Sequence, residues 1–328
     1  MPVVSYPVLR CISERIEANY RLSLSARCPE ISRIEKSIPL RVDRLCLLEN
    51  MVTINNMEYR IFSKDKRQNQ PLTLQLYNSK SKCTVEKTFS RNYEVEVATR
   101  KFVEYLLGGR RIIRVKLLIV PNSAYETVQY LFGLSTLKFN ALESWGIGLV
   151  KLHLLIESPL KELRLRVSHP TVFENLIART AEKLVIMCDG YDEPDTRLET
   201  HRNLLNKEVI IDTFLHDFTD IRIMELIEYW RETRKAVGSS FSVRKVNGDP
   251  IEMFLEKVKE RFEGTYLKLE QTDTNTFFDV NAVSIKIDSE SKIVVYGGRT
   301  YRTFPMASKV VIKVMAIGSF EENHQNVN

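Results

Sequence analysis

The sequence predicts an α/β fold with short N-terminal helices, a leucine-rich-repeat-like sheet with helices, and an α+β C-terminal part. Three observations predict it. Apolar residues recur at helical spacing before residue 40 and at every second position after it, and the pattern L-x-x-L-x-L recurs between residues 112 and 224. We expect a helical segment at 1–40, a repeat-like domain at 41–237 and a C-terminal region at 238–328.

The first forty residues predict three short helices. Val8, Ile12 and Ile16 lie four apart and therefore share one face of a first helix. A second short helix is expected around Leu22 and Leu24. A third is expected to begin at Pro29, because proline suits the first turn of a helix. Pro39 is expected to end the third helix.

From residue 40 the pattern predicts strands. Leu40, Val42, Leu45 and Leu47 alternate with one slip, and residues 52–62 predict a hairpin around Asn55-Asn56, since Asn tolerates the positive φ of a tight turn. Alternating leucines at 72–76 predict another strand. Residues 93–107 predict a helix with Val95, Phe102, Tyr105 and Leu106 near one face, ended by Gly108-Gly109.

The middle of the chain repeats a leucine pattern. Five expected strand centres are separated by 20, 26, 21 and 26 residues: Leu117, Leu137, Leu163, Leu184 and Ile210. These gaps fit leucine-rich-repeat units of about 20–29 residues. Further segments fit the pattern at residues 149–154 and 218–223. The Asn or Cys that such repeats carry at a fixed later position does not recur, so an ordinary α/β sheet is the alternative.

The last third predicts two helices and several strands. Met224–Lys235 predicts a helix with Leu226, Ile227 and Trp230, and Gly238-Ser239-Ser240 predicts a joint. Asp249 and Pro250 are expected to open a helix that Gly264 closes, with an apolar face formed by Phe254, Leu255, Val258 and Phe262. Strands are expected at 283–287, 293–296 and 309–317.

The residue pattern predicts no catalytic, metal or cofactor site, and we expect a non-enzymatic protein. The five histidines and five cysteines have no metal-ligand spacing. No run of about 18 apolar residues predicts a membrane span. The odd, scattered cysteines predict reduced thiols, and hence an intracellular protein, cytoplasmic or nuclear. An enzyme whose catalytic groups converge from distant positions remains an alternative.

Charge is unevenly distributed along the chain. Residues 1–120 hold 22 basic and 12 acidic residues, whereas the whole chain has a net charge of +6. A basic third of this kind can bind nucleic acid, and the segments 60–67, 80–91 and 110–116 would form that face. The alternative is a solvated basic surface, which we favour because the basic residues alternate with apolar ones at 110–116.

Residues 6–28 read YPVLRCISERIEANYRLSLSARC and resemble a degenerate F-box, with Tyr6-Pro7 and Cys28-Pro29 in place of its leading Leu-Pro and closing Trp. The rest of the chain resembles the nematode-expanded F-box-like and F-box-associated families, whose defining domains are of unknown function. The segments that carry this resemblance are RCPEISRIEKSIPLRVDRL (27–45), the hairpin at 53–59, SPLKELRL (158–165), AEKLVI (181–186), IEYWRETRKAVGSSFS (227–242) and SKIVVYGG (291–298).

The resemblance implies a substrate-recognition subunit of a cullin-type ubiquitin ligase. Its N-terminal helices would dock on a Skp1-type adaptor bound to a cullin, and the leucine-patterned middle would hold a target protein that the sequence does not identify. The apolar docking positions would be Pro7, Val8, Leu9, Ile12, Ile16, Leu22 and Leu24. The alternative is that these side chains pack against residues 40–76 as ordinary core.

Overall fold

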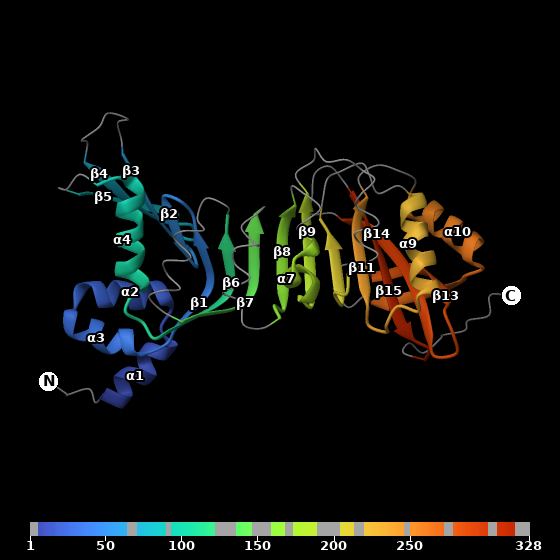
Figure 1. The fold of residues 1–328 in the computed structure, drawn as a ribbon, viewed down its shortest axis with the longest axis horizontal. Helices are drawn as coiled ribbons and strands as arrows, with labels where there is room; N and C mark the ends of the chain where they lie inside the picture. The colour runs from blue at the N-terminus through green and yellow to red at the C-terminus, as the bar shows by residue number, and fades with distance from the viewer. Residues whose placement is uncertain are drawn as a thin grey trace. The chain divides into compact units, whose positions relative to one another are not determined.

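The computed structural model forms two compact units, Met1–Lys161 and Glu162–Asn328, and each is described by itself (Figure 1). It is a mixed α/β protein, as predicted. The predicted divisions after residues 40 and 237 stay predictions. The structure describes residues 6–63, 71–89, 93–121, 136–145, 159–167, 173–188, 204–212, 220–245, 250–271, 278–300 and 307–318.

Three short helices open the N-terminal unit, as the apolar spacing predicts. They are α1 (Tyr6–Arg15), α2 (Ala18–Arg27) and α3 (Pro29–Ser37). The Glu17 carboxylate caps α2, because it accepts hydrogen bonds from the amides of Asn19 and Tyr20 at the start of the helix. Pro29 occupies the first turn of α3, where a missing N–H costs nothing.

The sheet of the N-terminal unit has the order β7-β6-β1-β2-β3-β4-β5. β1 pairs in parallel with β6, and β6 with β7, whereas β1 to β5 form an antiparallel series. The strands are β1 (Leu40–Leu47), β2 (Met51–Ile54), β3 (Met57–Ser63), β4 (Leu72–Asn78), β5 (Cys83–Thr88), β6 (Ile112–Val120) and β7 (Thr136–Trp145).

The predicted hairpin is confirmed. Ile54 pairs with Met57 across the two-residue turn, and Asn55 has a φ of +53°, in the left-handed region. The side chain of Asn55 reaches back to β1, where its Oδ1 accepts from the amides of Asp43 and Arg44 at 2.9 and 3.2 Å. These bonds lie where the burial alternation of β1 slips, since Asp43 to Arg44 breaks the pattern and leaves two consecutive residues exposed.

Helix α4 (Val95–Leu107) packs against β3 and is buried through Ala98, Val103 and Leu107. Its end is confirmed at Gly108, where a β-carbon would lie 2.4 Å from the carbonyl oxygen of Glu104. Phe102, Tyr105 and Leu106 share one face of the helix, as predicted, because all three line one groove, but the side chain of Tyr105 is mostly exposed. Leu106 carries the packing instead, and Tyr105 lies beside a groove described below.

The C-terminal unit has a sheet of the order β12-β13-β14-β15-β11-β10-β9-β8. β8 to β11 are parallel, and β15 to β12 continue the sheet antiparallel from β11. The strands are β8 (Glu162–Val167), β9 (Lys183–Cys188), β10 (Glu208–Ile211), β11 (Ser240–Lys245), β12 (Thr265–Gln271), β13 (Phe278–Lys286), β14 (Ser291–Thr300) and β15 (Ala307–Ala316).

The five expected strand centres all lie within strands, in β6, β7, β8, β9 and β10. In the C-terminal unit, Leu163 pairs in register with Leu184, whereas the partner of Leu184 in β10 is Val209, one residue before the expected centre Ile210. Val209 pairs in turn with Phe241 of β11. All four side chains are buried. A ladder of equivalent apolar positions across parallel strands is what buries the core of such a sheet.

Two other segments that fit the leucine pattern differ from expectation or lie outside the described residues. The pattern at 218–223 forms part of a helix, α9 (Asp220–Glu232), in which Ile223 is buried and Ile221 is mostly exposed. Apolar residues three apart can share a helix face, and apolar residues two apart can share a strand face. The pattern alone therefore does not distinguish a helix from a strand. Phe218, Leu134 and residues 149–154 lie outside the described part of the chain.

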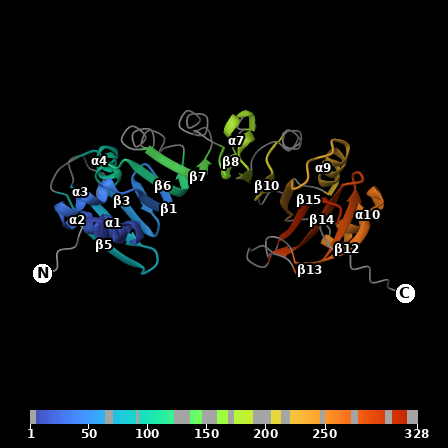
Figure 2. The ribbon, with the colours of Figure 1, turned by 90° about the horizontal axis from the view of Figure 1, so that it is seen from below.

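Within the described residues of the C-terminal unit, the helices beside the sheet are α7 (Leu176–Thr180), α9 and α10 (Ile251–Phe262). Helix α10 packs on β13 and β14 through the predicted apolar face, and Phe254, Leu255, Val258 and Phe262 are all buried (Figure 2). A β-carbon at Gly297 would lie 2.3 Å from the carbonyl oxygen of Lys309, so β14 needs glycine there. Asp249, the predicted cap, lies outside the described residues.

The opposite face of the same strands carries a second apolar cluster. Its members alternate with the residues that face α10, as the two-residue period of a strand requires. They are Leu269, Ala282, Val294, Tyr296 and Val311, with Leu267 and Met315 packed against them. Within the described residues, none of the helices is long and apolar enough to cross a membrane.

Candidate binding site

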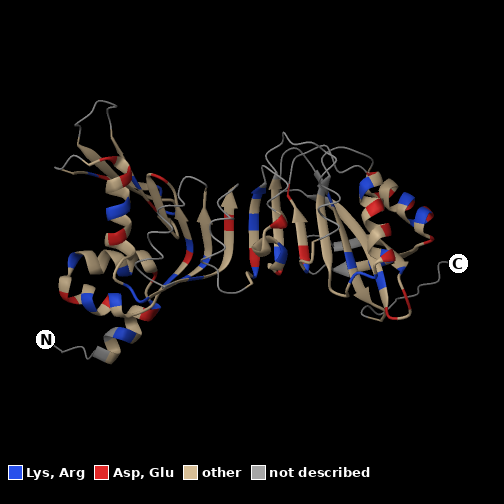
Figure 3. Cartoon of the chain, viewed as in Figure 1, with Lys and Arg blue, Asp and Glu red and all other residues tan. Residues whose placement is uncertain are grey.

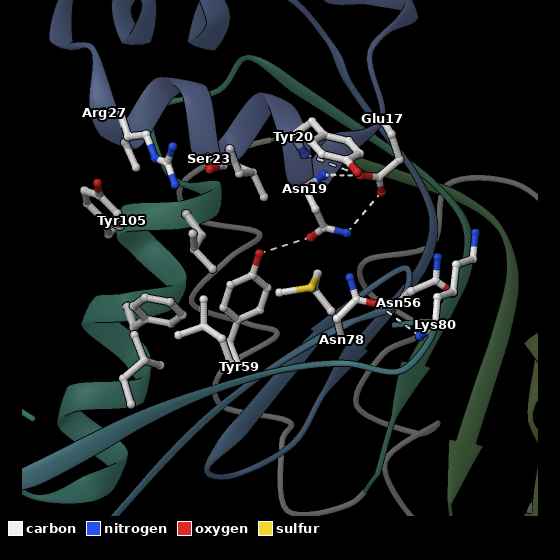
Figure 4. Close-up of a pocket in the computed structure, with 17 residues that line it drawn as sticks. Glu17, Asn19, Tyr20, Ser23, Arg27, Asn56, Tyr59, Asn78, Lys80 and Tyr105 are labelled. Atoms are coloured by element: carbon white, nitrogen blue, oxygen red, sulfur yellow. Dashed lines mark hydrogen bonds between the residues drawn. The ribbon is translucent and has the colours of Figure 1, made fainter. Parts of the chain in front are cut away.

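A groove lies between α2, α4 and the β3–β4 part of the N-terminal sheet (Figure 4). Its volume is about 490 Å³. Apolar and aromatic side chains form most of the wall, and amides and charged groups stand at the edge. The lining residues are Glu17, Asn19, Tyr20, Leu22, Ser23, Ala26, Arg27, Asn56, Met57, Tyr59, Leu74, Leu76, Asn78, Lys80, Phe102, Tyr105 and Leu106.

A hydrogen-bond network fixes α2 above the hairpin at one end of the groove. The Nδ2 group of Asn19 donates to the Glu17 carboxylate at 3.0 Å and to the carbonyl oxygen of Ile54 at 2.9 Å. The Nδ2 group of Asn55 donates to the same carboxylate. One acidic side chain therefore caps the helix and joins it to the turn between β2 and β3.

Tyr59 forms the floor of the groove. Its hydroxyl donates to Oδ1 of Asn19 at 3.1 Å, and its ring packs against Phe102 with centroids 5.6 Å apart and planes tilted by 49°. Burial, and to a smaller extent the charge of Glu17, raises the pKa of Tyr59 to about 12. The floor is thus neutral and fully hydrogen-bonded near neutral pH.

The raised pKa of Tyr59 makes stability depend on pH in the alkaline range. Between about pH 10 and pH 12, the Tyr59 hydroxyl is ionised in the unfolded chain and keeps its proton in the folded chain. The free energy of unfolding is therefore unaffected below about pH 10 and falls as the pH rises above it. At pH 11 the loss is about 1.4 kcal/mol. Tyr59→Phe lacks this ionisation.

We therefore expect the stability advantage of the natural chain over Tyr59→Phe to shrink by about 1.4 kcal/mol from neutral pH to pH 11. Urea unfolding of both proteins at the two pH values measures it. A stability difference that stays constant over this range would show that Tyr59 titrates alike in the folded and unfolded chain.

A buried ion cluster, defined by Arg21, Glu35 and Arg110, lies behind the groove. The Glu35 carboxylate contacts the Arg21 guanidinium at 3.0 Å and the Arg110 guanidinium at 2.7 Å, and each side chain is 2% exposed or less. Arg21 also donates to the carbonyl oxygens of Glu35, Ile38 and Pro39. The cluster ties α2 and α3 to the start of β6.

Burial lowers the pKa of both guanidiniums in this cluster, and the Glu35 charge opposes that shift. Two cations therefore share one buried anion, and Glu35 compensates half of their positive charge. Arg110 is buried in this cluster, so it cannot contribute to a basic surface that binds nucleic acid. On β6, Lys116 is exposed but pairs with Asp43 at 2.5 Å.

The basic surface expected for nucleic acid is not concentrated on one element in the described residues. Figure 3 shows Lys and Arg interspersed with Asp and Glu along α1 to α4. Residues 64–67 and 90–91 of the expected face lie outside the described part of the chain. The five histidines lie outside the described part of the chain, and the described cysteines and carboxylates form no cluster suited to a metal ion.

The seven predicted docking residues fall into three groups. Pro7, Val8, Ile12 and Leu24 are exposed, with Val8 and Ile12 at 49% and 47% on one face of α1. Ile16 is half-buried, and Leu22 is buried and lines the groove. Leu9 lies in α1, but its side chain is outside the described part of the structure.

Sequence reasoning missed the groove. Three of its walls come from segments far apart in the chain, at α2, the β3–β4 strands and α4, and no motif marks their meeting. Tyr20 and Tyr105 gave a weak indication of the groove. Both are large aromatic residues that fall outside the buried stripe of their helices, and both are mostly exposed at the edge of the groove.

Comparison with known proteins gives one match. Residues 94–247 match the family model of a domain of unknown function, DUF3557. The match starts at the residue before α4 and ends just after β11, so it includes one wall of the groove and the parallel ladder β8 to β11. No curated protein and no solved structure matches the chain.

Proposed function

We propose that this protein is a non-enzymatic protein-interaction adaptor, the substrate-recognition subunit of a cullin-type ubiquitin ligase. Its F-box-like helices would bind a Skp1-type adaptor. The observation that carries the proposal is the exposure of Val8 and Ile12, which lie one turn apart on α1. Large aliphatic side chains paired on one face of a short surface helix are suited to contact another protein.

The packing of the N-terminal unit supports this role for α1. Helices α2 and α3 are held to the sheet by Leu22, by the buried ion cluster and by the Asn19 network. Helix α1 packs against α3, and its outer face carries the two exposed residues. A helix already folded on a packed base needs less ordering on binding than an unfolded segment would.

The C-terminal unit supports the second half of the proposal, a surface for a target protein. Its parallel ladder of β8 to β11 buries Leu163, Leu184, Val209 and Phe241 in register. A stack of this kind gives a stiff platform for an extended contact. The protein would make and break no covalent bond. It would act by raising the effective concentration of a target beside the ligase.

The test is binding of purified Skp1-type adaptor, alone and with cullin, to immobilised full chain. We expect the double variant Val8→Glu and Ile12→Glu to lose adaptor binding by at least about tenfold, because two charges would have to be desolvated in the interface. Both positions are half exposed, so the melting temperature should stay close to that of the natural chain.

Ile221→Glu is the matched control. Ile221 is also an exposed isoleucine, 61% exposed on α9 of the other unit, and its replacement should leave adaptor binding unchanged. The proposal fails if the natural chain does not bind the adaptor, or if the double variant binds as tightly as the control.

A further inference from the structure

We infer that the groove between α2, α4 and β3–β4 binds a small amphipathic anion, with an apolar body and one carboxylate at its end. The volume of about 490 Å³ lies within the range of roughly 300–1,000 Å³ found for small-molecule sites. The wall has the usual composition of such sites, because apolar and aromatic side chains predominate and the charged groups lie at the two ends.

The floor suits an apolar body because its polar groups already have partners. Tyr59 donates its hydroxyl proton to Asn19, and the Nδ2 group of Asn19 donates to both Glu17 and Ile54. A hydrocarbon chain or ring that covers them therefore leaves no donor unpaired. It gains contact with Leu74, Leu76 and Phe102, among other apolar side chains.

The side chains at the two ends of the groove determine where the carboxylate of the ligand would bind. Ser23 and Arg27 lie four apart on α2, and Figure 4 shows them with Tyr105 at one end of the groove. All three side chains donate hydrogen bonds, which suits a carboxylate. In the described part of the chain, no carboxylate lies within ion-pair distance of Arg27.

The other end of the groove is less suited to an anion. Asn56, Asn78 and Lys80 lie there with Glu17, the one acidic lining residue. The Glu17 carboxylate occupies the N-terminus of α2, where a second anion would be repelled. An amphipathic anion is therefore oriented with its carboxylate towards Arg27 and its apolar body over Tyr59.

The probe for the site is dansyl-undecanoic acid, titrated below its micelle concentration against the full chain while dansyl emission is followed. Ala26 lines the groove from an exposed position, so Ala26→Trp should fill the space without disturbing the core. We expect this variant to weaken probe binding by at least about tenfold, through lost apolar contact. Met253→Trp, at an exposed position on α10, adds the same bulk elsewhere and should bind normally.

The head group is tested by charge. Arg27→Gln should weaken binding of the acid by about three- to fivefold, as for an exposed ion pair, while Arg33→Gln on the exposed side of α3 should not. The same dansyl chain ending in an alcohol should bind the natural protein as weakly as the acid binds Arg27→Gln. Equal binding of acid and alcohol would overturn the carboxylate assignment.

The site itself is overturned if the natural chain does not bind the probe, or if Ala26→Trp binds it as tightly as Met253→Trp. This result is independent of the adaptor proposal. The double variant at Val8 and Ile12 leaves the groove intact, so it should lose the adaptor and keep the probe.

Discussion

Glu35→Gln is expected to lower the free energy of unfolding of the N-terminal unit by about 3–5 kcal/mol. The carboxylate is the one acidic group within the buried ion cluster, and it contacts both Arg21 and Arg110. Its replacement by a neutral amide of the same shape leaves two guanidiniums buried without a counter-charge. Urea unfolding, with hydrogen exchange of the α2, α3 and β1 amides as the local readout, measures the effect.

Asp43→Asn is the matched control for this prediction. It also converts a carboxylate into an amide in an ion pair, with Lys116, but both side chains are largely exposed. An exposed pair contributes about 0–1 kcal/mol, so this variant should be close to the natural chain. Similar losses in the two variants would show that burial of the cluster does not control its contribution.

Phe254→Ala is expected to destabilise the C-terminal unit by about 3–5 kcal/mol. Phe254 is completely buried on the face of α10 that packs on β13 and β14. Removing its ring takes away apolar contact and leaves a cavity that the helix can close only in part. Since the chain forms two units, exchange rates of the β13 and β14 amides give a more local measurement than a single melting curve.

Met253→Ala tests the same helix at the neighbouring position. Met253 is 52% exposed, so its truncation should change stability by no more than about 0.5 kcal/mol. The packing of α10 described above is contradicted if the two alanine variants unfold alike, or if Met253→Ala has the larger effect.

Local patterns predicted much of the fold. The spacing of Val8 and Ile12 predicted α1, although the helix ends one residue before Ile16. Asn55-Asn56 predicted the two-residue turn, in which Asn55 has a positive φ. The leucine pattern placed strands around Leu163 and Leu184 in the C-terminal unit. These signals are local, because a helix face or a turn is set by residues a few positions apart.

Strands without a buried face were not predicted. All six residues of β5 are exposed, so Cys83–Thr88 carries no alternation of apolar and polar positions, and its backbone pairing with β4 alone makes it a strand. The leucine pattern at 218–223 gave the opposite error, because it indicated a repeat strand where helix α9 forms. Its spacing also fits a helix.

Contacts between residues far apart in the chain could not be predicted from the sequence either. Arg21, Glu35 and Arg110 are ordinary surface residues by type, and they are buried together only where α2 and α3 meet the segment that precedes β6. The groove depends on the same assembly, because its walls come from α2, α4 and two strands. Sequence reasoning identified Leu22 as a partner-binding residue, whereas the structure places it in the wall of that groove.

The most direct test of the adaptor role is hydrogen exchange of the full chain with and without purified Skp1-type adaptor. We expect slower exchange within Tyr6–Arg15, the helix that carries exposed Val8 and Ile12, when the adaptor is present. Unchanged exchange throughout that helix at saturating adaptor would contradict it, whether or not protection occurs elsewhere in the chain.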